Sequence, residues 1–314
     1  MALNGDIPIG SRVVVRYKLP PGYTHPVTDV IGVLESLDPI AVRGNDGRLI
    51  QVSVGQVVAM KTIGARPIRI GEIRNLESAA AQAWPGVDQE WIDGWYLRAG
   101  HGISSRANSA LPLGGPGAVA GTGADVLDAI RQWYADRGLR TVLALPDRLA
   151  TVPPGWVTER ETVVMAADLE NLTLPIGPPT ATVAPSPDPR WLAMYGADAG
   201  GHVESVLRAG AGDLGFGRIG NDQTSLAIGR AAVTVSPDSR HWVGLSAIAV
   251  AAEHRRRGIG SLIGGDLLAW GRLHGATHAY VQVIDDNDGA RALWRELGFV
   301  EHHRYRYATD PVGG

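Results

Sequence analysis

The sequence of 314 residues contains no cysteine. Disulfide bonds, cysteine nucleophiles and thiolate metal sites are therefore excluded. No uninterrupted apolar stretch is long enough to span a bilayer, and the first residues have neither the basic nor the apolar segment of a secretory signal. His274 and His278 have the i, i+4 spacing of a metal site on a helix, but Gly275 interrupts the helix between them. We therefore expect a cytoplasmic protein with no membrane contact and no bound metal.

An excess of charge of one sign is also missing. The chain has 29 Lys and Arg against 32 Asp and Glu, which gives a net charge of -3. This balance argues against a nucleic-acid partner. With 45% hydrophobic and 19% charged residues, the composition is that of a globular protein. The length predicts two or three domains.

The most informative stretch begins with a predicted strand from 243 to 250. Its large apolar residues alternate with small ones, as in a strand that is buried on both faces. The run Arg255-Arg256-Arg257-Gly258-Ile259-Gly260 follows, and helical apolar spacing begins at Ser261 and continues to Leu273. The pattern therefore predicts a strand, a glycine loop and the N-terminus of a helix.

This arrangement is suited to binding a diphosphate. The first turn of a helix has unpaired N–H groups and the positive end of the helix dipole. Glycines let the backbone approach an anion closely, and arginines add planar donors. Two other phosphate loops do not fit the sequence. Gly260 lacks the Lys that follows the glycine in a Walker loop, and Ile263 stands where a dinucleotide fingerprint needs a third glycine.

Arg255-x-x-Gly258-x-Gly260 after a buried strand resembles the acetyl-CoA loop of the GNAT-type N-acyltransferases. A second predicted strand at 279–283, the pair Asp286-Asn287 and a helix that ends in Leu297-Gly298-Phe299 resemble later parts of that family in the same order. The resemblance implies an α/β (α+β) fold with a mixed, mostly antiparallel central sheet. It also implies acetyl-CoA as co-substrate and an amine as acceptor.

The resemblance further implies a set of cofactor-binding residues. The backbone of one strand would bind pantetheine and the acetyl carbonyl, the loop would bind the pyrophosphate, and an asparagine would bind the pantetheine arm. In this order the residues are Ile248, Ala249 and Val250; Arg255, Arg256, Arg257, Gly258, Ile259, Gly260 and Ser261; and Asn287. We expect Trp294 to be a core residue that also lines the thioester.

The catalytic residues are less well defined. The family usually has a tyrosine acid where this chain has Trp294, and an indole cannot protonate a thiolate as a phenol can. Either Tyr305, Tyr307 or water then supplies the proton, or the enzyme is impaired. The strand before the loop has no carboxylate to act as base, so Ser246 is the candidate, acting through a chain of waters. Glu253 is expected to be a solvated charge.

Residues 1–62 contain five short predicted strands and the turn Asn45-Asp46-Gly47, which predicts a small SH3-like β-barrel. We interpret it as a docking or dimerisation module, through which the chain could form a homo-oligomer. Six prolines in the stretch 174–190 predict a linker. Residues 191–314 are the predicted catalytic domain.

Residues 63–173 look like a degenerate copy of the catalytic domain. A shift of 137 positions places Gly258–Gly260 on Gly121–Gly123, whereas the three arginines fall on Ala118, Val119 and Ala120. This copy is therefore predicted to have lost CoA binding. The barrel and the Gly94-Trp95-x-x-Arg98 and Arg106-Ala107-Asn108-Ser109 stretches resemble actinobacterial tandem GNAT proteins. Some of these are described as histone or protein acetyltransferases.

The predicted function is transfer of an acetyl group from acetyl-CoA to a primary amine by direct attack. The acceptor would be a lysine of a histone or another protein. One alternative is a small-molecule amine or antibiotic acetyltransferase. Another is a non-catalytic acetyl-CoA sensor or assembly module.

Overall fold

The computed structural model describes residues 7–44, 46–64, 66–115, 118–196, 201–221 and 223–311. The chain divides into two compact units, Met1–Pro67 and Ile68–Gly314, which are considered separately below. Asn45, which belongs to the predicted hairpin turn, lies outside the described residues. Within the described ranges, no helix is long and apolar enough to cross a membrane.

The first unit is an antiparallel sheet with the strand order β4-β3-β2-β1-β5. All five strands that the sequence predicts are present. Alternate residues point inward, such as Val13 and Val15 of β1, and form the core of the unit. The elements are β1 Arg12–Lys18, β2 Val27–Leu37, β3 Ile40–Gly44, β4 Leu49–Val52, the 3-10 turn η1 Val54–Gln56 and β5 Val57–Thr62.

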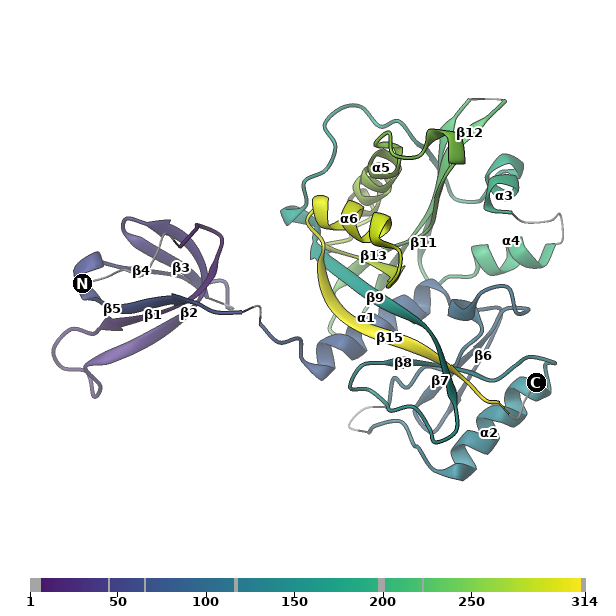
Figure 1. Ribbon diagram of the computed structural model, residues 1–314, viewed down its shortest axis with the longest axis horizontal. Coiled ribbons are helices and arrows are strands. Elements are labelled where there is room, and N and C mark those ends of the chain that lie inside the picture. The colour runs from purple at the N-terminus through teal and green to yellow at the C-terminus, as the bar shows by residue number, and fades with distance from the viewer. Residues whose placement is uncertain are drawn as a thin grey trace. The chain divides into compact units, whose positions relative to one another are not determined.

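The second unit combines helices with a large mixed sheet (Figure 1). Its first half contains α1 Ile70–Ala83, β6 Asp88–Ile92, β7 Trp95–Ala99, η2 Ser105–Ala107, α2 Ala124–Ala135, β8 Val142–Pro146, β9 Val157–Asp168 and η3 Leu169–Asn171. Its second half contains β10 Thr182–Ala184, α3 Pro189–Tyr195, α4 Gly201–Arg208, β11 Asp213–Gly220, β12 Ser225–Val235, β13 His241–Val250, η4 Ala252–His254, α5 Ile259–Leu273, β14 His278–Ile284, α6 Asp288–Glu296 and β15 Val300–Thr309.

The two halves exchange their last strands. The sheet order is β10-β11-β12-β13-β14-β9-β15-β8, so β9 of the first half pairs with β14 of the second. In return, β15 of the second half pairs with β8 of the first. The exchanged strands β9 and β15 are antiparallel neighbours at the centre of this arrangement (Figure 1). Strands from both halves therefore form one continuous sheet.

The connectivity of the two halves is similar around this exchange. β13 runs parallel to β14, and a parallel bridge between Ala110 and Leu143 occupies the corresponding place in the first half. The 137-residue shift from the sequence carries the bounds of α5 to 122–136, which contain α2, and those of β14 to 141–147, which contain β8. The order and pairing of these elements are therefore similar in the two halves.

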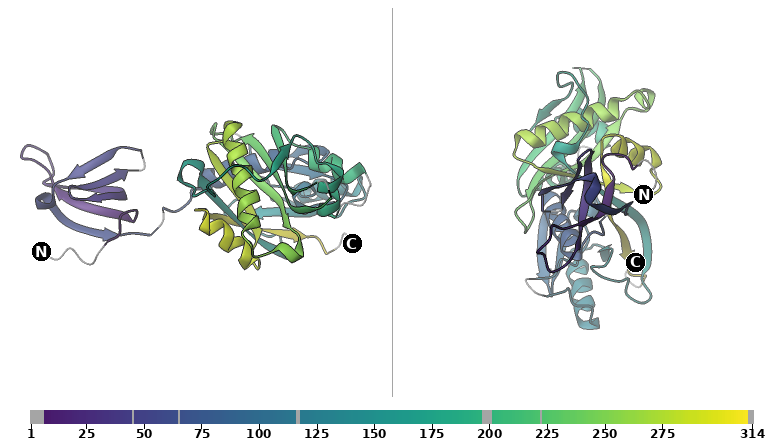
Figure 2. Two further views of the ribbon diagram at one scale, coloured as in Figure 1. Left: turned by 90° about the horizontal axis from the view of Figure 1, so that it is seen from above. Right: turned by 90° about the vertical axis from the view of Figure 1, so that its left-hand side faces the viewer.

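Helices cover both faces of the sheet (Figure 2). On one face, α5 and α6 pack on a core that includes Ile263, Leu267 and Trp294. On the other face, α1 packs through Leu76 and Ala80, and its end meets α3 and α4 in a further cluster. The strand β9 contacts both layers, which explains why residues 162–166 are buried without alternation.

The proline-rich stretch 174–190 lies against this fold. It contains the edge strand β10, which pairs with β11, and Leu174 packs on the core beneath α5. Pro175 is so close to Gly265 of α5 that a side chain at Gly265 would clash with its ring, at 2.6 Å from Cδ. A strand at the edge of a sheet tolerates neighbouring prolines because its outer N–H groups need no partner.

Arg230 of β12 joins the helices on one face to the sheet. Its side chain is fully buried and donates to the carbonyls of Leu207 at 2.8 Å, Ala83 at 2.9 Å and Ala209 at 3.1 Å. The guanidinium also lies over the Trp84 ring, 4.3 Å from its centroid. Burial lowers the pKa of Arg230 to about 10. This one side chain satisfies three carbonyls at the ends of α1 and α4.

We expect Arg230→Met to lower the free energy of unfolding by about 3–5 kcal/mol, because buried carbonyls lose their donors. Urea denaturation followed by circular dichroism measures the change. Arg208→Met is the matched control, because the Arg208 side chain is 57% exposed and pairs only with Glu204 at the surface. Its effect should stay within about 0.5 kcal/mol. Equal stability of the two variants would contradict the role given to Arg230.

The strand exchange predicts that neither half is stable alone. A fragment of residues 174–314 lacks β9, so β14 and β15 would expose unpaired edges. We expect this fragment to aggregate when it is expressed alone and to become soluble when it is co-expressed with residues 1–173. Size-exclusion chromatography and circular dichroism give the readout. A monomeric, cooperatively unfolding 174–314 fragment would show that the exchange is dispensable.

Candidate functional site

A fork opens between β13 and β14. The two strands are paired from Trp242↔His278 to Leu245↔Val281, and no pairing between them extends beyond this point. β14 continues along β9, whereas β13 continues along β12 as far as Val250. A bulge at Ala247, where φ is +52°, accompanies the divergence. From Ala247 to Val250 the residues of β13 are only partly buried.

The fork leaves backbone groups of β13 without a strand partner on one side. Ile248, Ala249 and Val250, which the resemblance places at the pantetheine and acetyl group, lie in this segment. β12 pairs with Ala249 and Val250 on the opposite side. The open side can therefore hydrogen-bond an extended ligand as an added strand would, because its N–H and C=O groups need partners.

The predicted glycine loop connects the fork to α5. The Nε of Arg255 donates to the carbonyl of Val250 at 3.2 Å and closes the turn. Gly258 is the N-cap of α5 and has φ +78°, a conformation that glycine adopts without strain. No side chain caps this helix start. The first N–H groups of α5, at Ile259 and Gly260, are therefore available to an anion.

Gly260 also has a packing role beside the one that the sequence suggests. A Cβ at this position would come within 2.8 Å of Cδ1 of Leu293 on α6, whereas Gly258 has open space around it. Gly260 therefore allows α6 to pack closely against α5. Ser261 follows in the first turn, and its N–H donates to the carbonyl of Gly258 at 3.0 Å.

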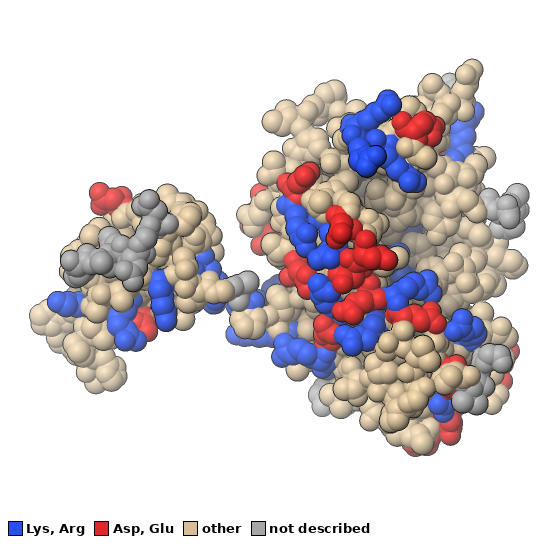
Figure 3. Space-filling view, in the orientation of Figure 1, with Lys and Arg blue, Asp and Glu red and all other residues tan. Residues whose placement is uncertain are grey.

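Positive charge gathers over the start of α5. Arg255, Arg256 and Arg257 are all exposed, and Arg256 is held at φ +58°. Figure 3 shows basic side chains over the loop before α5, with an acidic group beside them. Together with the free N–H groups, these residues make a site whose charge and donors suit a diphosphate.

The corresponding helix start in the first half has the opposite charge. A Cβ at Gly121 would collide with the carboxylate of Asp93, and one at Gly123 would collide with that of Asp125. The carbonyl of Gly121 also accepts a hydrogen bond from Nε1 of Trp95 at 2.7 Å. The start of α2 is thus occupied by acidic side chains and a tryptophan, which oppose an anionic ligand.

Asn287 and Trp294 belong to α6 and its N-cap, which lie on the same face of the sheet as α5. Asn287 is exposed at the start of α6, and its Oδ1 accepts from the N–H of Ala290 at 3.1 Å. Trp294 is 4% exposed and packs on Gly264 of α5 and on Phe299. The indole therefore fills the core under α5, as the sequence predicts for its first role.

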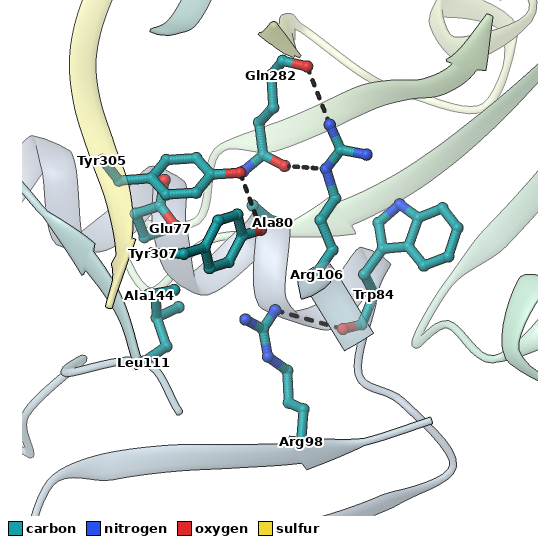
Figure 4. Close-up of a pocket in the computed structure, with 10 residues that line it drawn as sticks. All are labelled: Glu77, Ala80, Trp84, Arg98, Arg106, Leu111, Ala144, Gln282, Tyr305 and Tyr307. Carbon is teal, nitrogen blue, oxygen red and sulfur yellow. Dashed lines mark hydrogen bonds between the residues drawn. The ribbon is translucent and has the colours of Figure 1, made fainter. Parts of the chain in front are cut away.

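The predicted catalytic residues lie on the opposite face of the sheet. Ser246, the residue of β13 just beyond the fork, is buried and accepts from Nε1 of Trp84 at 3.2 Å. Tyr305 is 3% exposed, and its hydroxyl lies 3.3 Å from that of Tyr307. Both tyrosines line a small cavity (Figure 4).

This cavity brings in residues that the site prediction missed. Arg106 of η2 donates to Oε1 of Gln282 at 2.7 Å and to the Gln282 carbonyl at 3.0 Å. Gln282 follows Val281, the last residue of β14 that pairs with β13, so the cavity lies at the fork (Figure 4). Glu77 and Trp84 from α1 and its C-cap, and Arg98 from β7, complete its polar lining.

Two sequence signals could have indicated these residues. Arg106 lies in the Arg-Ala-Asn-Ser stretch, where Asn108 binds the N–H groups of Gly100 and Gly102 and Ser109 binds Arg98. Glu77 lies on the apolar face of α1 with Ile73, Leu76 and Ala80, where a lone carboxylate is unusual. Among the described ranges, no cluster of three or more possible metal ligands occurs.

Comparisons with known proteins agree with this geometry. The family model described as "Probable histone acetyltransferase Rv0428c C-terminal" matches residues 70–308, and "Rv0428c N-terminal Sm-like domain" matches residues 7–61. The small β unit expected to be SH3-like is thus related to Sm-like domains, which are close to it in architecture.

Two individual proteins are similar to the chain over most of its length. "Probable histone acetyltransferase Rv0428c" of Mycobacterium tuberculosis is 39% identical over 307 residues, which cover 95% of this chain and 94% of that protein. "Uncharacterized N-acetyltransferase YobR" of Bacillus subtilis is 26% identical over 257 residues, covering 75% of this chain and 98% of that protein.

A solved structure shows the same fold. It is a GCN5-related N-acetyltransferase from Kribbella flavida with a TM-score of 0.56 and 18% identity, covering 78% of this chain and 98% of its own. Taken with the family match over residues 70–308, these findings show that the chain belongs to the family described as probable histone acetyltransferase Rv0428c and is an N-acetyltransferase with the GNAT fold.

Proposed function

We propose that the chain transfers an acetyl group from acetyl-CoA to a primary amine at the fork between β13 and β14. The observation that carries the proposal is the adjacency of three features. These are the segment Ile248–Val250, which β14 leaves open on one side, the uncapped start of α5 and the exposed arginines 255–257. An extended thiol arm can lie along the first while its diphosphate is bound by the other two.

In this arrangement the protein mainly positions and polarises the reactants. The free N–H groups of β13 would hold the acetyl carbonyl and stabilise negative charge as the amine attacks. Asn287 would donate its side-chain N–H to the pantetheine arm, since its oxygen already accepts from Ala290. Tyr305, at the cavity beside the fork, would protonate the leaving thiolate in place of the phenol that Trp294 replaces.

The acceptor that we propose is a protein lysine, as the name of the 39% identical relative suggests. A small-molecule amine is the second candidate, because the name of the 26% identical relative, an N-acetyltransferase, specifies no protein acceptor. The first unit we propose to be a docking or dimerisation module. Exposed apolar side chains support that proposal, among them Ile31, Val33, Leu49 and Val58.

We further propose that residues 63–173 are a degenerate GNAT copy that does not bind acetyl-CoA. The similar strand connectivity supports common architecture, and the acidic side chains at the start of α2 support the loss of phosphate binding. The copy then contributes to the second half its strand β9, which pairs with β14, and the side chains that line the cavity.

Reversing two charges of the loop tests the cofactor site. We expect Arg255→Glu combined with Arg257→Glu to weaken acetyl-CoA binding at least about 100-fold, measured by isothermal titration calorimetry. The control is Lys18→Glu combined with Arg48→Glu, which changes the net charge equally at exposed positions of the first unit. Unchanged affinity in the loop variant would mean that the cofactor binds elsewhere.

The acid assignment is tested with Tyr305→Phe. Loss of one phenolic proton donor should lower kcat about 10–100-fold while the Kd for acetyl-CoA stays within about twofold. Thiol release with a panel of small amines, lysine peptides and histone peptides measures the rate and also identifies the acceptor. Ser246→Ala should cost less than about fivefold, because its hydroxyl accepts from Trp84 and is held in a structural bond. A full rate for Tyr305→Phe would remove Tyr305 from the mechanism.

A further inference from the structure

Glu77 is a buried carboxylate that the mechanism above does not use. It comes from α1 in the first half, and its side chain is 4% exposed. Its Oε1 lies 2.8 Å from Nε2 of His303 on β15, which is equally buried. Among the described residues that line the cavity at the fork, Glu77 is the only carboxylate. It thus combines a position at the fork with a fixed histidine partner.

The cavity has room for one water molecule. Its volume is about 10 Å³, close to the minimum for a single water, and its lining is largely polar. Gln282, which follows the last residue of β14 paired with β13, forms one wall, and Tyr305 and Tyr307 form another (Figure 4). A water at this place would connect Glu77 to groups at the fork, where the amine must meet the thioester.

Two histidines of β15 hold Glu77 in place. Nδ1 of His303 lies 2.8 Å from Nδ1 of His302, and His302 is partly exposed. When Glu77 is ionised, Nε2 of His303 carries the proton and donates to it. Nδ1 of His303 is then the acceptor and Nδ1 of His302 the donor. In this tautomer pair His303 holds the Glu77 carboxylate as a hydrogen-bond donor.

The surrounding charges favour a neutral amine. The groups that face Glu77 are, besides His303, the guanidinium groups of Arg98 and Arg106 and the phenols of Tyr280, Tyr305 and Tyr307. Burial raises the pKa of Tyr280 and Tyr307, so both stay protonated. Two arginines against one carboxylate give the cavity a positive balance, which disfavours an ammonium ion and promotes loss of its proton.

We infer that Glu77 is the general base of the reaction, supplied by the half that has lost its own cofactor site. This inference rests on the proposed acetyl transfer. The acceptor ammonium gives one proton to the water, which gives one to Glu77. The neutral amine then attacks the thioester carbon and a C–N bond forms. As the C–S bond breaks, the nitrogen releases its second proton to solvent and the thiolate takes a proton from Tyr305, whose phenolate is reprotonated by Glu77 through the water. His303 positions Glu77 by donating its Nε2 proton to the carboxylate.

The test is Glu77→Gln, which keeps the shape of the side chain and removes the base. At pH 7 we expect kcat to fall about 100-fold or more while the acetyl-CoA Kd stays within about twofold of the wild type. The rate of the variant should then rise steadily with pH, because solvent base replaces the carboxylate, so the deficit narrows at high pH. Glu90→Gln, at an exposed position of the same half, is the control and should retain the wild-type profile.

A second variant covers the case in which Glu77→Gln does not fold, as judged by its urea midpoint. His303→Gln keeps an N–H donor for Glu77 but removes the imidazole that His302 holds in place, so it should shift the acid limb of the pH–rate profile and lower kcat less. A wild-type pH profile and rate in the folded Glu77→Gln variant would overturn the assignment. If that variant does not fold, a wild-type profile in His303→Gln would overturn it.

The same experiments separate this inference from the proposed function. If the wild-type chain releases no thiol with any amine of the panel, acetyl transfer itself fails. If the wild type turns over and Glu77→Gln matches it, only the identity of the base fails. If the wild type turns over and the variant shows the steep pH dependence, both stand.

Discussion

The exchange of β9 and β15 is the constraint on which the rest of the second unit depends. Each of these strands finds its partners in the half that it does not belong to, and the two also pair with each other. The fork opens between β13 and β14, and β9 pairs with the other edge of β14. The first half cannot be removed from the sheet without leaving the second half with an unpaired strand.

This exchange divides the site between the two faces of one sheet. The face covered by α5 and α6 carries the loop that suits a diphosphate, and all its parts come from residues 248–294. The other face carries the cavity with Glu77, Arg106 and Tyr305, in which the first half contributes most of the polar groups. The fork connects the two faces, because there the strands are no longer held together by hydrogen bonds.

The separation of the site between two faces also explains which of its parts could be predicted from the sequence. The strand, loop and helix around Gly258 are one local pattern, and so are the five short strands of the first unit. Arg106 and Gln282 meet across 176 residues, and Glu77 and His303 meet across 226. Such contacts follow from strand exchange, which no spacing in the sequence reveals. Gly260 matched the motif, but the side chain that requires a glycine there is Leu293, from another helix.

The acidic residues at the start of α2 have a consequence for how the first half responds to mutation. The loop before α2 takes no part in the strand exchange, so a substitution there leaves the pairing of β9 with β14 unchanged. A substitution in β9, or at a buried side chain that contacts the second half, disturbs both halves. Asp93 and Asp125 therefore lie where a change stays local, whereas a change at Glu77 reaches His303 on β15. Tolerance to mutation is thus divided within the first half between its loop and its shared strand.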